Sequence, residues 1–275
     1  MGTFAGRAVR KILRDVKSPR DAAVLCWRAM VPPDPRLREI RSRIWGNLPR
    51  VALREAFPGI ETVDIQILEP YRRQLASTLD LEELSALLAI VRYTNSKNIL
   101  EIGTYDGSTT LNLAANLPED ARVVTVDLPP QSAADQTAIT VPTEHRNKTK
   151  HVIGERFLQS PHRSKIRQVF GDSAALDWTS LGLFDIVFID GCHFQEYVLS
   201  DTRNAFAVLR PGGLVVWHDY GQNRHVTEVV DGMRSPGSKP SSQNGRNGSA
   251  LPSGNGRTYV AISGTRLALA ASARP

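Results

Sequence analysis

From about residue 78 onward, short apolar runs alternate with longer stretches of helical periodicity. The first helical stretch has an apolar stripe, and Asp80 stands before it as an N-cap. The stripe consists of Leu81, Leu84, Leu87, Leu88 and Val91. The apolar runs after it are Asn98–Ile102, Arg122–Val126, Ile166–Phe170, Phe184–Ile189 and Leu214–Trp217. Because these runs are short and apolar or β-branched, we expect parallel strands that helices bury on both faces.

The end of the chain carries a different pattern. Two apolar runs, Thr258–Ile262 and Leu267–Ala271, flank a three-residue turn, which predicts a terminal antiparallel hairpin. Residues 129–165 follow the second strand, and their first part is polar and contains prolines, so we expect a lid-like insertion there. Residues 235–256 are rich in Ser, Gly, Asn and Pro, which indicates a flexible loop.

The first 75 residues differ from the rest in charge. The 275-residue chain has a net charge of +6, yet residues 1–75 carry +7 and residues 76–275 carry −1. We therefore predict a basic, mainly helical N-terminal extension and an α/β domain over residues 76–275. Residues 4–17 have the pattern of a basic amphipathic helix. Such a helix can contact nucleic acid, an anionic membrane surface or an acidic protein, or pack as an arm on this or a neighbouring subunit of a homo-oligomer.

The cysteine count and the start of the chain bear on the compartment. Cys26 and Cys192 are far apart and form neither a disulfide framework nor a zinc-binding spacing. The first residues lack the apolar stretch of a signal peptide, and no apolar run is long enough to span a bilayer. These observations favour a reduced, cytoplasmic protein.

The strand expected at residues 98–102 leads into a glycine turn and then a helix. Gly103 allows the chain to turn sharply, and Gly107 allows a ligand to approach the start of the helix. The spacing G-x-x-x-G differs from the G-x-G-x-x-G of dinucleotide sites, and Glu101 precedes it by two residues. This arrangement suits a ligand with an amino-acid part and a nucleoside part. A purely structural turn in another α/β protein is the alternative.

Acidic residues follow the next two strands at the same, carboxyl edge of the expected sheet. Asp127 ends the second strand and is placed to accept hydrogen bonds from ribose hydroxyls. Asp172 follows the third strand, where it can accept from an adenine amino group, and Ser173 is a candidate cap for the next helix. Each acid can instead be a helix cap alone, so the assignment depends on the glycine turn beside it.

Four polar residues follow the fourth and fifth strands: Asp190 and His193 after one, His218 and Asp219 after the other. The carboxyl ends of parallel strands form the ligand crevice of open α/β sheets. Carboxylates there can hold a divalent cation that positions a substrate hydroxyl, and either histidine can act as a general base. The alternative is structural, with Asp190 as a cap and His218 packed and hydrogen-bonded. Asp201 lies on the inward stripe of the helix between these strands, where a buried carboxylate needs a partner such as His193 or a main-chain amide. Equally, it can lie at the water-exposed margin of the helix, and it is given no catalytic role.

Together these segments resemble the class I S-adenosylmethionine-dependent methyltransferases. The resemblance covers residues 78–275 and depends on EIGTYDGS at 101–108, Asp127, GDS at 171–173, FIDGCH at 188–193 and LRPGGLVVWHDY at 209–220. Within this class the chain is similar to O-methyltransferases, such as those that act on catechol, macrolide sugars and aminocoumarin sugars. The resemblance implies a Rossmann-like sheet of seven mostly parallel strands, with helices on both faces and the last strand antiparallel.

The resemblance also implies S-adenosyl-L-methionine as cofactor and a set of residues that bind it. Asp127 matches the ribose-binding acid, Asp172 and Ser173 match the adenine contact, and Asp190 borders the cofactor. The methionine part of the cofactor matches the glycine turn. The turn residues concerned are Glu101, Gly103, Tyr105, Gly107 and Ser108.

For catalysis the resemblance points to His193, His218 and Asp190. Members that need a divalent cation place Asp-Asp or Asp-Asn where this chain has His218-Asp219. The expected metal ligands are therefore Asp190, His218 and Asp219, holding Mg²⁺, Mn²⁺ or another divalent ion, and imidazole suits Mn²⁺ better than Mg²⁺.

We therefore expect O-methylation of a hydroxyl on a small molecule or a sugar. Two other functions stay open from the sequence. An RNA methyltransferase would use the basic extension to hold nucleic acid, although that region has no recognisable RNA-binding motif. A methyltransferase fold without activity would serve as a binding module, but the intact glycine turn argues against this.

Overall fold

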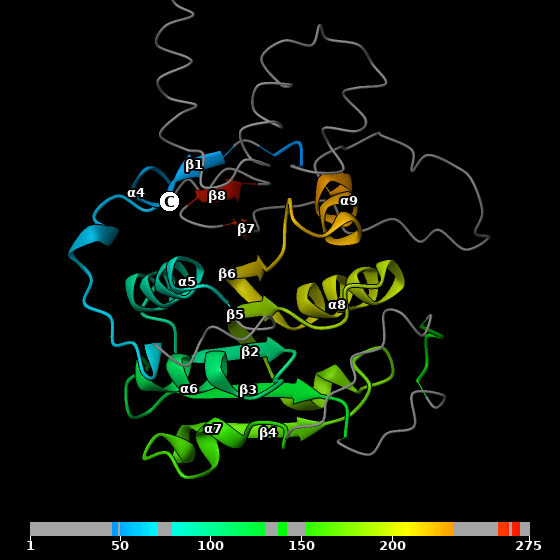
Figure 1. Cartoon of the computed structure of the whole chain (residues 1–275), viewed down its shortest axis with the longest axis horizontal. Helices are drawn as coiled ribbons and strands as arrows, with labels where there is room; N and C mark the ends of the chain where they lie inside the picture. The colour runs from blue at the N-terminus through cyan, green and yellow to red at the C-terminus, as the bar shows by residue number, and fades with distance from the viewer. Residues whose placement is uncertain are drawn as a thin grey trace, which may run out of the picture. The chain divides into compact units, whose positions relative to one another are not determined.

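The structure is a computed structural model, and it describes residues 46–48, 50–70, 79–129, 137–141, 152–233, 258–263 and 266–269. These residues form one eight-stranded sheet in the order β1-β8-β7-β6-β5-β2-β3-β4 (Figure 1). Strands β2 to β7 run parallel, and β8 is antiparallel to both β7 and β1. The strands are β1 Arg50–Ala52, β2 Asn98–Ile102, β3 Arg122–Asp127, β4 Ile166–Phe170, β5 Phe184–Ile189, β6 Leu209–Trp217, β7 Thr258–Ser263 and β8 Arg266–Leu269.

The mostly parallel sheet with helices on both faces is confirmed, but the strand count is eight among the described residues rather than seven. The additional strand is β1, whose three residues pair with β8. It comes from the N-terminal extension, where proline-interrupted sequence offers no strand periodicity. The described residues before position 75 thus contribute a sheet edge, and the boundary at residue 75 stays a prediction.

Helices cover the two faces of the sheet separately (Figure 1). Helices α5, α6 and α7 pack on one face, and α8 and α9 pack on the other. Side chains alternate along each strand. In β5, Val187 and Ile189 therefore pack toward α8 and α9, while Ile186 and Phe188 pack toward α5, α6 and α7. The helical elements are α4 Leu53–Ala56, η1 Ile60–Thr62, α5 Leu81–Tyr93, α6 Ser108–Ala115, α7 Glu155–Leu158, η4 Arg163–Lys165, η5 Trp178–Leu181, α8 Gln195–Val208 and α9 Arg224–Gly232.

Helix α5 begins where its sequence predicts. The side chain of Asp80 accepts a hydrogen bond from the backbone N–H of Glu83 at 2.7 Å. In return, the Glu83 carboxylate accepts from the backbone N–H of Asp80 at 3.4 Å, which completes a capping box. Four residues of the predicted apolar stripe are buried, but Leu81 in the first turn is 49% exposed.

Several predictions lie outside the described residues. They concern the amphipathic helix at residues 4–17, the loop at 235–256 and most of the insertion between residues 129 and 151. The described parts of the insertion include α7 and η4. Within the part of the chain that the structure describes, no helix is long and apolar enough to cross a membrane.

The carboxyl ends of β2, β3, β5 and β6 meet at one edge of the sheet. The backbone N–H of Asp190 donates to the carbonyl of Ile102 at the end of β2, and that of His218 donates to the carbonyl of Ile189 at the end of β5. Gly103 has φ +102°, and a Cβ there would lie 2.2 Å from the carbonyl oxygen of Asp190. Only glycine therefore fits where the first turn passes the end of β5.

Candidate functional site

The glycine turn is held by the side chain of Asp127 at the end of the neighbouring strand β3. Asp127 accepts from the backbone N–H groups of Thr104 at 3.0 Å and Tyr105 at 2.8 Å through Oδ2. Its Oδ1 accepts from the N–H of Leu128 at 2.8 Å. A carboxylate has about four acceptor positions, so Asp127 retains one for a ribose hydroxyl. Asp127 thus shapes the turn, and its predicted contact with ribose stays a prediction.

Glu101 is fully buried at the end of β2. Its Oε2 accepts from the hydroxyls of Thr110 and Thr125, while its Oε1 has no hydrogen-bond partner among the described residues. Burial raises the pKa of this carboxyl to about 8, against the two threonine hydrogen bonds that lower it. A buried carboxyl with one unused oxygen is a candidate to receive a donor from a ligand.

The carboxylate of Asp172 accepts more hydrogen bonds than the sequence analysis predicts. Its Oδ1 accepts from the N–H of Ala174 and the hydroxyl of Tyr197, both at 2.9 Å, and its Oδ2 accepts from the N–H of Ala138. Asp172 therefore anchors the described segment 137–141 of the insertion. The predicted capping role of Ser173 is wrong, because the next helical turn, η5, is capped by the side chain of Asp177.

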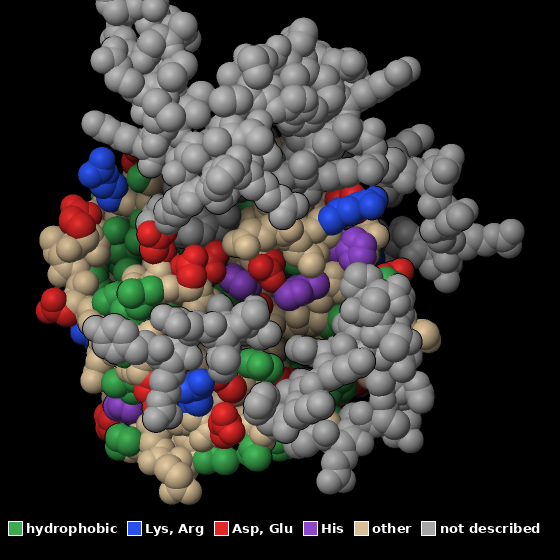
Figure 2. All heavy atoms as spheres, viewed as in Figure 1, with side chains coloured by type: hydrophobic (Ala, Val, Ile, Leu, Met, Phe, Trp, Pro, Cys, Tyr) green, Lys and Arg blue, Asp and Glu red, His purple; other side chains and the backbone are tan. Residues whose placement is uncertain are grey.

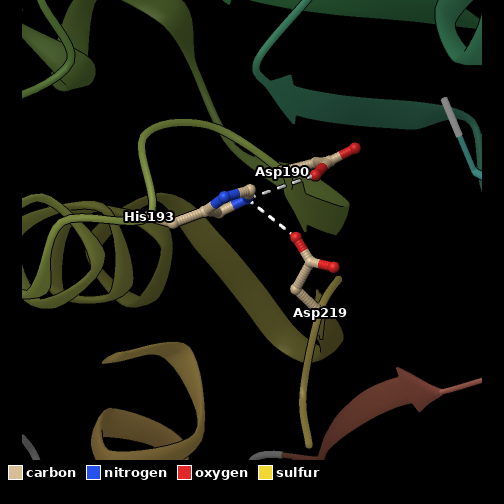
Figure 3. Close-up of side chains that lie close together, drawn as sticks. All are labelled: Asp190, His193 and Asp219. Atoms are coloured by element: carbon tan, nitrogen blue, oxygen red, sulfur yellow. Dashed lines mark ion pairs between the residues drawn. The ribbon is translucent and has the colours of Figure 1, made fainter. Parts of the chain in front are cut away.

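Three side chains converge beyond the ends of β5 and β6 (Figure 3). Atoms of Asp190, His193 and Asp219 that can bind a metal all lie within 4.8 Å of one another. The Nε2 atom of His193 lies 2.9 Å from Oδ2 of Asp219 and 3.8 Å from Oδ1 of Asp190. This nitrogen is buried and, despite the short distance to Asp219, forms no hydrogen bond of good geometry.

Backbone conformation and hydrogen bonds fix the two loops that carry this cluster. Asp219 has φ +59°, a left-handed conformation that Asp tolerates better than most residues. Its carbonyl accepts from the N–H groups of Gln222 and Asn223, which closes the turn into α9. The carbonyl of His193 accepts from Nδ1 of His225 on α9 at 3.1 Å. On the face in Figure 2, acidic and histidine side chains reach the surface together, and the His193 side chain is 40% exposed.

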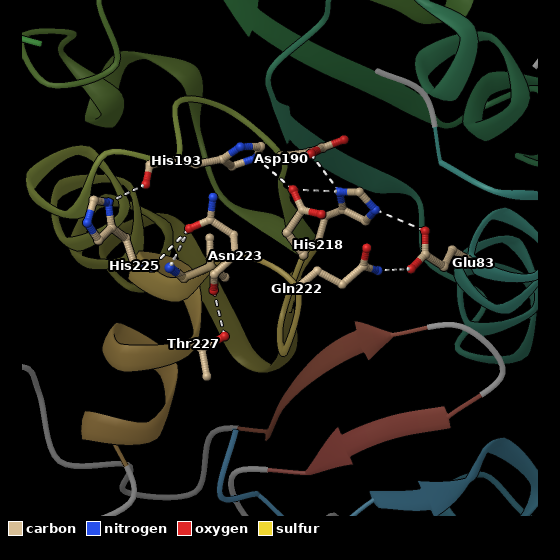
Figure 4. Close-up of polar contacts among 10 residues, drawn as sticks. Glu83, Asp190, His193, His218, Gln222, Asn223, His225 and Thr227 are labelled. Carbon is tan, nitrogen blue, oxygen red and sulfur yellow. Dashed lines mark hydrogen bonds and ion pairs between the residues drawn. The ribbon is translucent and has the colours of Figure 1, made fainter. Parts of the chain in front are cut away.

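His218 lies beside the cluster, with both ring nitrogens in use (Figure 4). Its Nδ1 is 2.9 Å from Oδ1 of Asp190, and its Nε2 is 3.0 Å from Oε2 of Glu83. The sequence assigned His218 to the metal ligands and to catalysis. In the described structure the side chains that could hold a metal ion are Asp190, His193 and Asp219. Both ring nitrogens of His218 lie within hydrogen-bond distance of carboxylates, and its assigned role stays a prediction.

Charges in the cluster shift one another's pKa values. Burial alone would lower the pKa of His193, but the carboxylates of Asp190 and Asp219 outweigh it and raise that pKa to about 9. In the same way burial is outweighed at His218, whose pKa the carboxylates of Asp190, Asp219 and Glu83 raise far above its usual range. The two imidazoles overcome burial at Asp190 and Asp219 and lower both carboxyl pKa values.

Two further acidic residues are buried, of which the sequence analysis singled out Asp201 and not Asp106. Asp201 is buried as expected, but neither oxygen accepts a hydrogen bond of good geometry among the described residues, and burial raises its pKa to about 7. Of the alternatives that the sequence left open for Asp201, a hydrogen bond to His193 is not among the contacts of the described residues. Asp106 was not singled out, yet it caps the backbone of Ser108 and pairs with Arg156, which also pairs with Glu69. No local pattern marks this network, because its members lie far apart in the sequence.

Glu83 is the other residue that sequence reasoning missed. At the third position of a helix that begins with Asp80, a glutamate is what a capping box requires. That signal accounts for its presence without reference to a site. Only the packing of α5 on the face of the sheet brings Glu83 to His218.

Comparisons with known proteins bear on the family of this chain. Residues 100–220 match a family model described as a methyltransferase domain. Catechol O-methyltransferase B of Danio rerio is 27% identical over 146 residues, which are 52% of this chain and 50% of that protein. Caffeoyl-CoA O-methyltransferase 3 of Nicotiana tabacum is 25% identical over 178 residues, 65% of this chain and 67% of that protein. The chain thus spans half to two thirds of the length of these relatives.

Among solved structures, one similar chain is an O-methyltransferase from Bacillus cereus in complex with SAH. It has a TM-score of 0.42 and 18% sequence identity. The similarity covers 76% of this chain and 83% of that one.

Proposed function

Residues 100–220 of this chain carry a methyltransferase domain of the class I, S-adenosylmethionine-dependent type, and from this premise we propose that the protein methylates a hydroxyl oxygen of a small molecule or a sugar. The observation that carries the proposal is the cluster of Asp190, His193 and Asp219 at the carboxyl edge of the sheet. A hydroxyl must lose its proton to become a good methyl acceptor, and this cluster can provide for that loss.

The cofactor fits the residues around the glycine turn. S-adenosylmethionine has an ammonium group and a sulfonium group, and the unused Oε1 of Glu101 supports a cationic donor there. Residues Gly103, Tyr105, Gly107 and Ser108 form the turn against which its methionine part would lie. Asp127 retains one acceptor position for the ribose, as described above.

At the adenine end, the proposed contacts are Asp172 and Ser173. The Oδ2 atom of Asp172 accepts one hydrogen bond, from Ala138, so an acceptor position is left for an amino group. Ala138 belongs to the insertion, and its contact with Asp172 places that segment beside the proposed adenine position.

The cluster also fits a divalent cation. Its donors are two carboxylates and one imidazole, and the buried Nε2 of His193 makes no hydrogen bond that a metal would have to replace. With Glu83 and His218 included, three carboxylates face two imidazoliums, so one negative charge is in excess. If a divalent cation took the place of the His193 proton, that excess would be removed. When bound, the ion would lower the pKa of an acceptor hydroxyl and orient it.

The raised pKa of His193 supports one of the two roles that the sequence left open. At about 9, it keeps the imidazole protonated at neutral pH, and a protonated imidazole cannot accept a proton from the acceptor. We therefore assign His193 to the cation and not to free general-base catalysis. In the reaction the acceptor oxygen bonds to the methyl carbon, the S–CH₃ electron pair stays on sulfur, and the hydroxyl proton passes to solvent water. The cluster and the turn supply the alignment.

Calorimetric titration with S-adenosylhomocysteine, followed by Mn²⁺, tests the proposal. We expect both to bind, and Asp219→Asn to weaken Mn²⁺ while leaving S-adenosylhomocysteine affinity within about twofold. Catechol and caffeoyl-CoA are the first acceptors to test with a labelled methyl group, because the relatives carry those names. Failure to bind S-adenosylhomocysteine, or methyl transfer to RNA but to no small molecule, would contradict the proposal.

A further inference from the structure

The hydrogen-bonded cluster extends beyond the three residues assigned to the cation. Asp190 is linked through His218 to Glu83, which lies on α5, a helix outside the strand ends that form the site (Figure 4). The order of contacts is Asp190 to Nδ1 of His218 at 2.9 Å and Nε2 of His218 to Glu83 at 3.0 Å. A carboxylate, an imidazole and a second carboxylate thus form a continuous row.

Glu83 is an unusual residue for a helix cap. Its side chain is only 4% exposed, whereas glutamates in a first turn are ordinarily solvated. Besides the contact with His218, its Oε1 accepts from Nε2 of Gln222 at 3.2 Å. Its capping contact with the N–H of Asp80 is the longest of these, at 3.4 Å. Burying a charge is costly unless it is paired, and here the pairing partner is the histidine of the row.

We infer that Glu83 is a positioning residue for the proposed cation site: through His218 it fixes the orientation of the Asp190 carboxylate. The inference rests on the proposed function and deepens it. With both ring nitrogens bonded to carboxylates, the His218 ring has one orientation that satisfies both, so its Nδ1–H stays directed at Oδ1 of Asp190. Oδ1 is also the oxygen of Asp190 that lies 3.8 Å from Nε2 of His193, so the contact with His218 fixes this carboxylate relative to the other residues of the cluster.

The contact between His218 and Asp190 should affect the affinity of the site for a cation. Ligands of metal sites are commonly held by a second group, and loss of that group weakens metal binding by about 10-fold to 100-fold. Glu83 acts one contact further out, and His218 is the group that transmits its effect. A role in helix capping alone would leave the site untouched when the Glu83 charge is removed.

Glu83→Gln separates the two roles. A glutamine at this position still completes a capping box, so α5 keeps its N-terminus. The charge that pairs with His218 is lost. The matched control is Glu82→Gln, which removes the same charge from the preceding, exposed position of the same helix turn.

The measurement is the Mn²⁺ dissociation constant of the full-length protein saturated with S-adenosylhomocysteine, by calorimetry or by electron paramagnetic resonance of free Mn²⁺. We expect Glu83→Gln to raise this constant about 10-fold, and Glu82→Gln to leave it within about twofold. Thermal unfolding of both variants monitors the fold. Equal Mn²⁺ affinity of Glu83→Gln and the wild type would overturn the inference.

A double-mutant cycle tests whether Glu83 acts through His218. In His218→Asn the shorter amide can still donate to Asp190 but cannot reach Glu83. We expect Glu83→Gln to add less than about twofold to the dissociation constant in that background, because the connecting group is gone. Additive effects of the two substitutions would contradict the relay. If the wild type binds S-adenosylhomocysteine but no Mn²⁺, the inference fails while the cofactor part of the proposed function stands. If it binds neither, the proposed function itself fails.

Discussion

Two carboxyl groups at the same sheet edge have pKa values shifted in opposite directions, because their neighbours differ. Glu101 is surrounded by apolar strands and two hydroxyls, so burial dominates and raises its pKa to about 8. Asp190 ends the neighbouring strand β5, but two imidazoles outweigh burial and lower its pKa. At the scale of single residues, therefore, the partner of each acid decides whether it is charged, and the amino-acid type does not.

Glu101→Gln should flatten the pH dependence of stability. A carboxyl whose folded pKa is raised from 4.5 to about 8 contributes stability that is complete below pH 4.5 and is lost as the pH rises through 8. Between these values the wild type should lose up to about 1.4 kcal/mol per pH unit from this group. The free energy of unfolding without cofactor, measured by urea titration at pH 5 and pH 8, should therefore fall more in the wild type than in the variant. Equal losses would contradict the assignment.

Asp219→Asn should lower the pKa of His193. The substitution removes one of the two carboxylates that raise this pKa to about 9, so protonated imidazole loses a charge partner 2.9 Å away. A proton NMR titration of the His193 ring in the metal-free protein should show a midpoint nearer 6.5 in the variant. Asp177→Asn, at the cap of η5, is the control and should leave the His193 midpoint unchanged.

At the scale of the elements, the conformation of the glycine turn depends on the strand that it passes, β5. Strand and helix patterns along the chain predict β2, β5 and α5 to within a residue or two, because burial on both faces and a capping box are local signals. The pattern cannot show that the first turn passes directly under the end of β5. That contact explains Gly103, whose missing side chain leaves room for the carbonyl of Asp190.

Gly103→Ala should destabilise the protein by about 3 kcal/mol or more, through an unfavourable φ and a clash with backbone. The control is Gly232→Ala, where a Cβ meets nothing within 4 Å and φ is not positive. That substitution should be neutral or stabilising by up to about 1 kcal/mol. Urea unfolding measures both, and similar stabilities of the two variants would refute the contact.

At the scale of the whole molecule, the buried side chain of Tyr220 connects residues 47 and 48 to the segment that follows β6. The hydroxyl of Tyr220 accepts from the N–H of Leu48 at 2.8 Å and donates to Asp231 at 2.6 Å. Asp231 also accepts from the backbone and side chain of Asn47. Tyr220 follows Asp219 directly, so the tyrosine that holds residues 47 and 48 is the sequence neighbour of a proposed cation ligand.

Tyr220→Phe should therefore cost about 1–3 kcal/mol, because it leaves the buried N–H of Leu48 without an acceptor. Tyr93→Phe is the matched control. That tyrosine also makes one hydroxyl contact, to the carbonyl of Pro58, but it is 39% exposed, and water can replace the bond. Its loss should cost less than about 0.5 kcal/mol. A ranking of melting temperatures with Tyr93→Phe below Tyr220→Phe would contradict this account.

By itself the sequence determined the alternation of strands and helices, the glycine turn and the rim to which Asp190, His193, His218 and Asp219 belong. Each of these follows from burial or from the rule that parallel strands end at one edge. Only the tertiary structure decided that β1 joins the sheet and that Asp127 and Asp172 also hold backbone segments. It also decided that His218 lies between Asp190 and Glu83, while His193 lies beside Asp219. Those outcomes depend on which distant side chains arrive at the same place, and spacing along the chain carries no record of that.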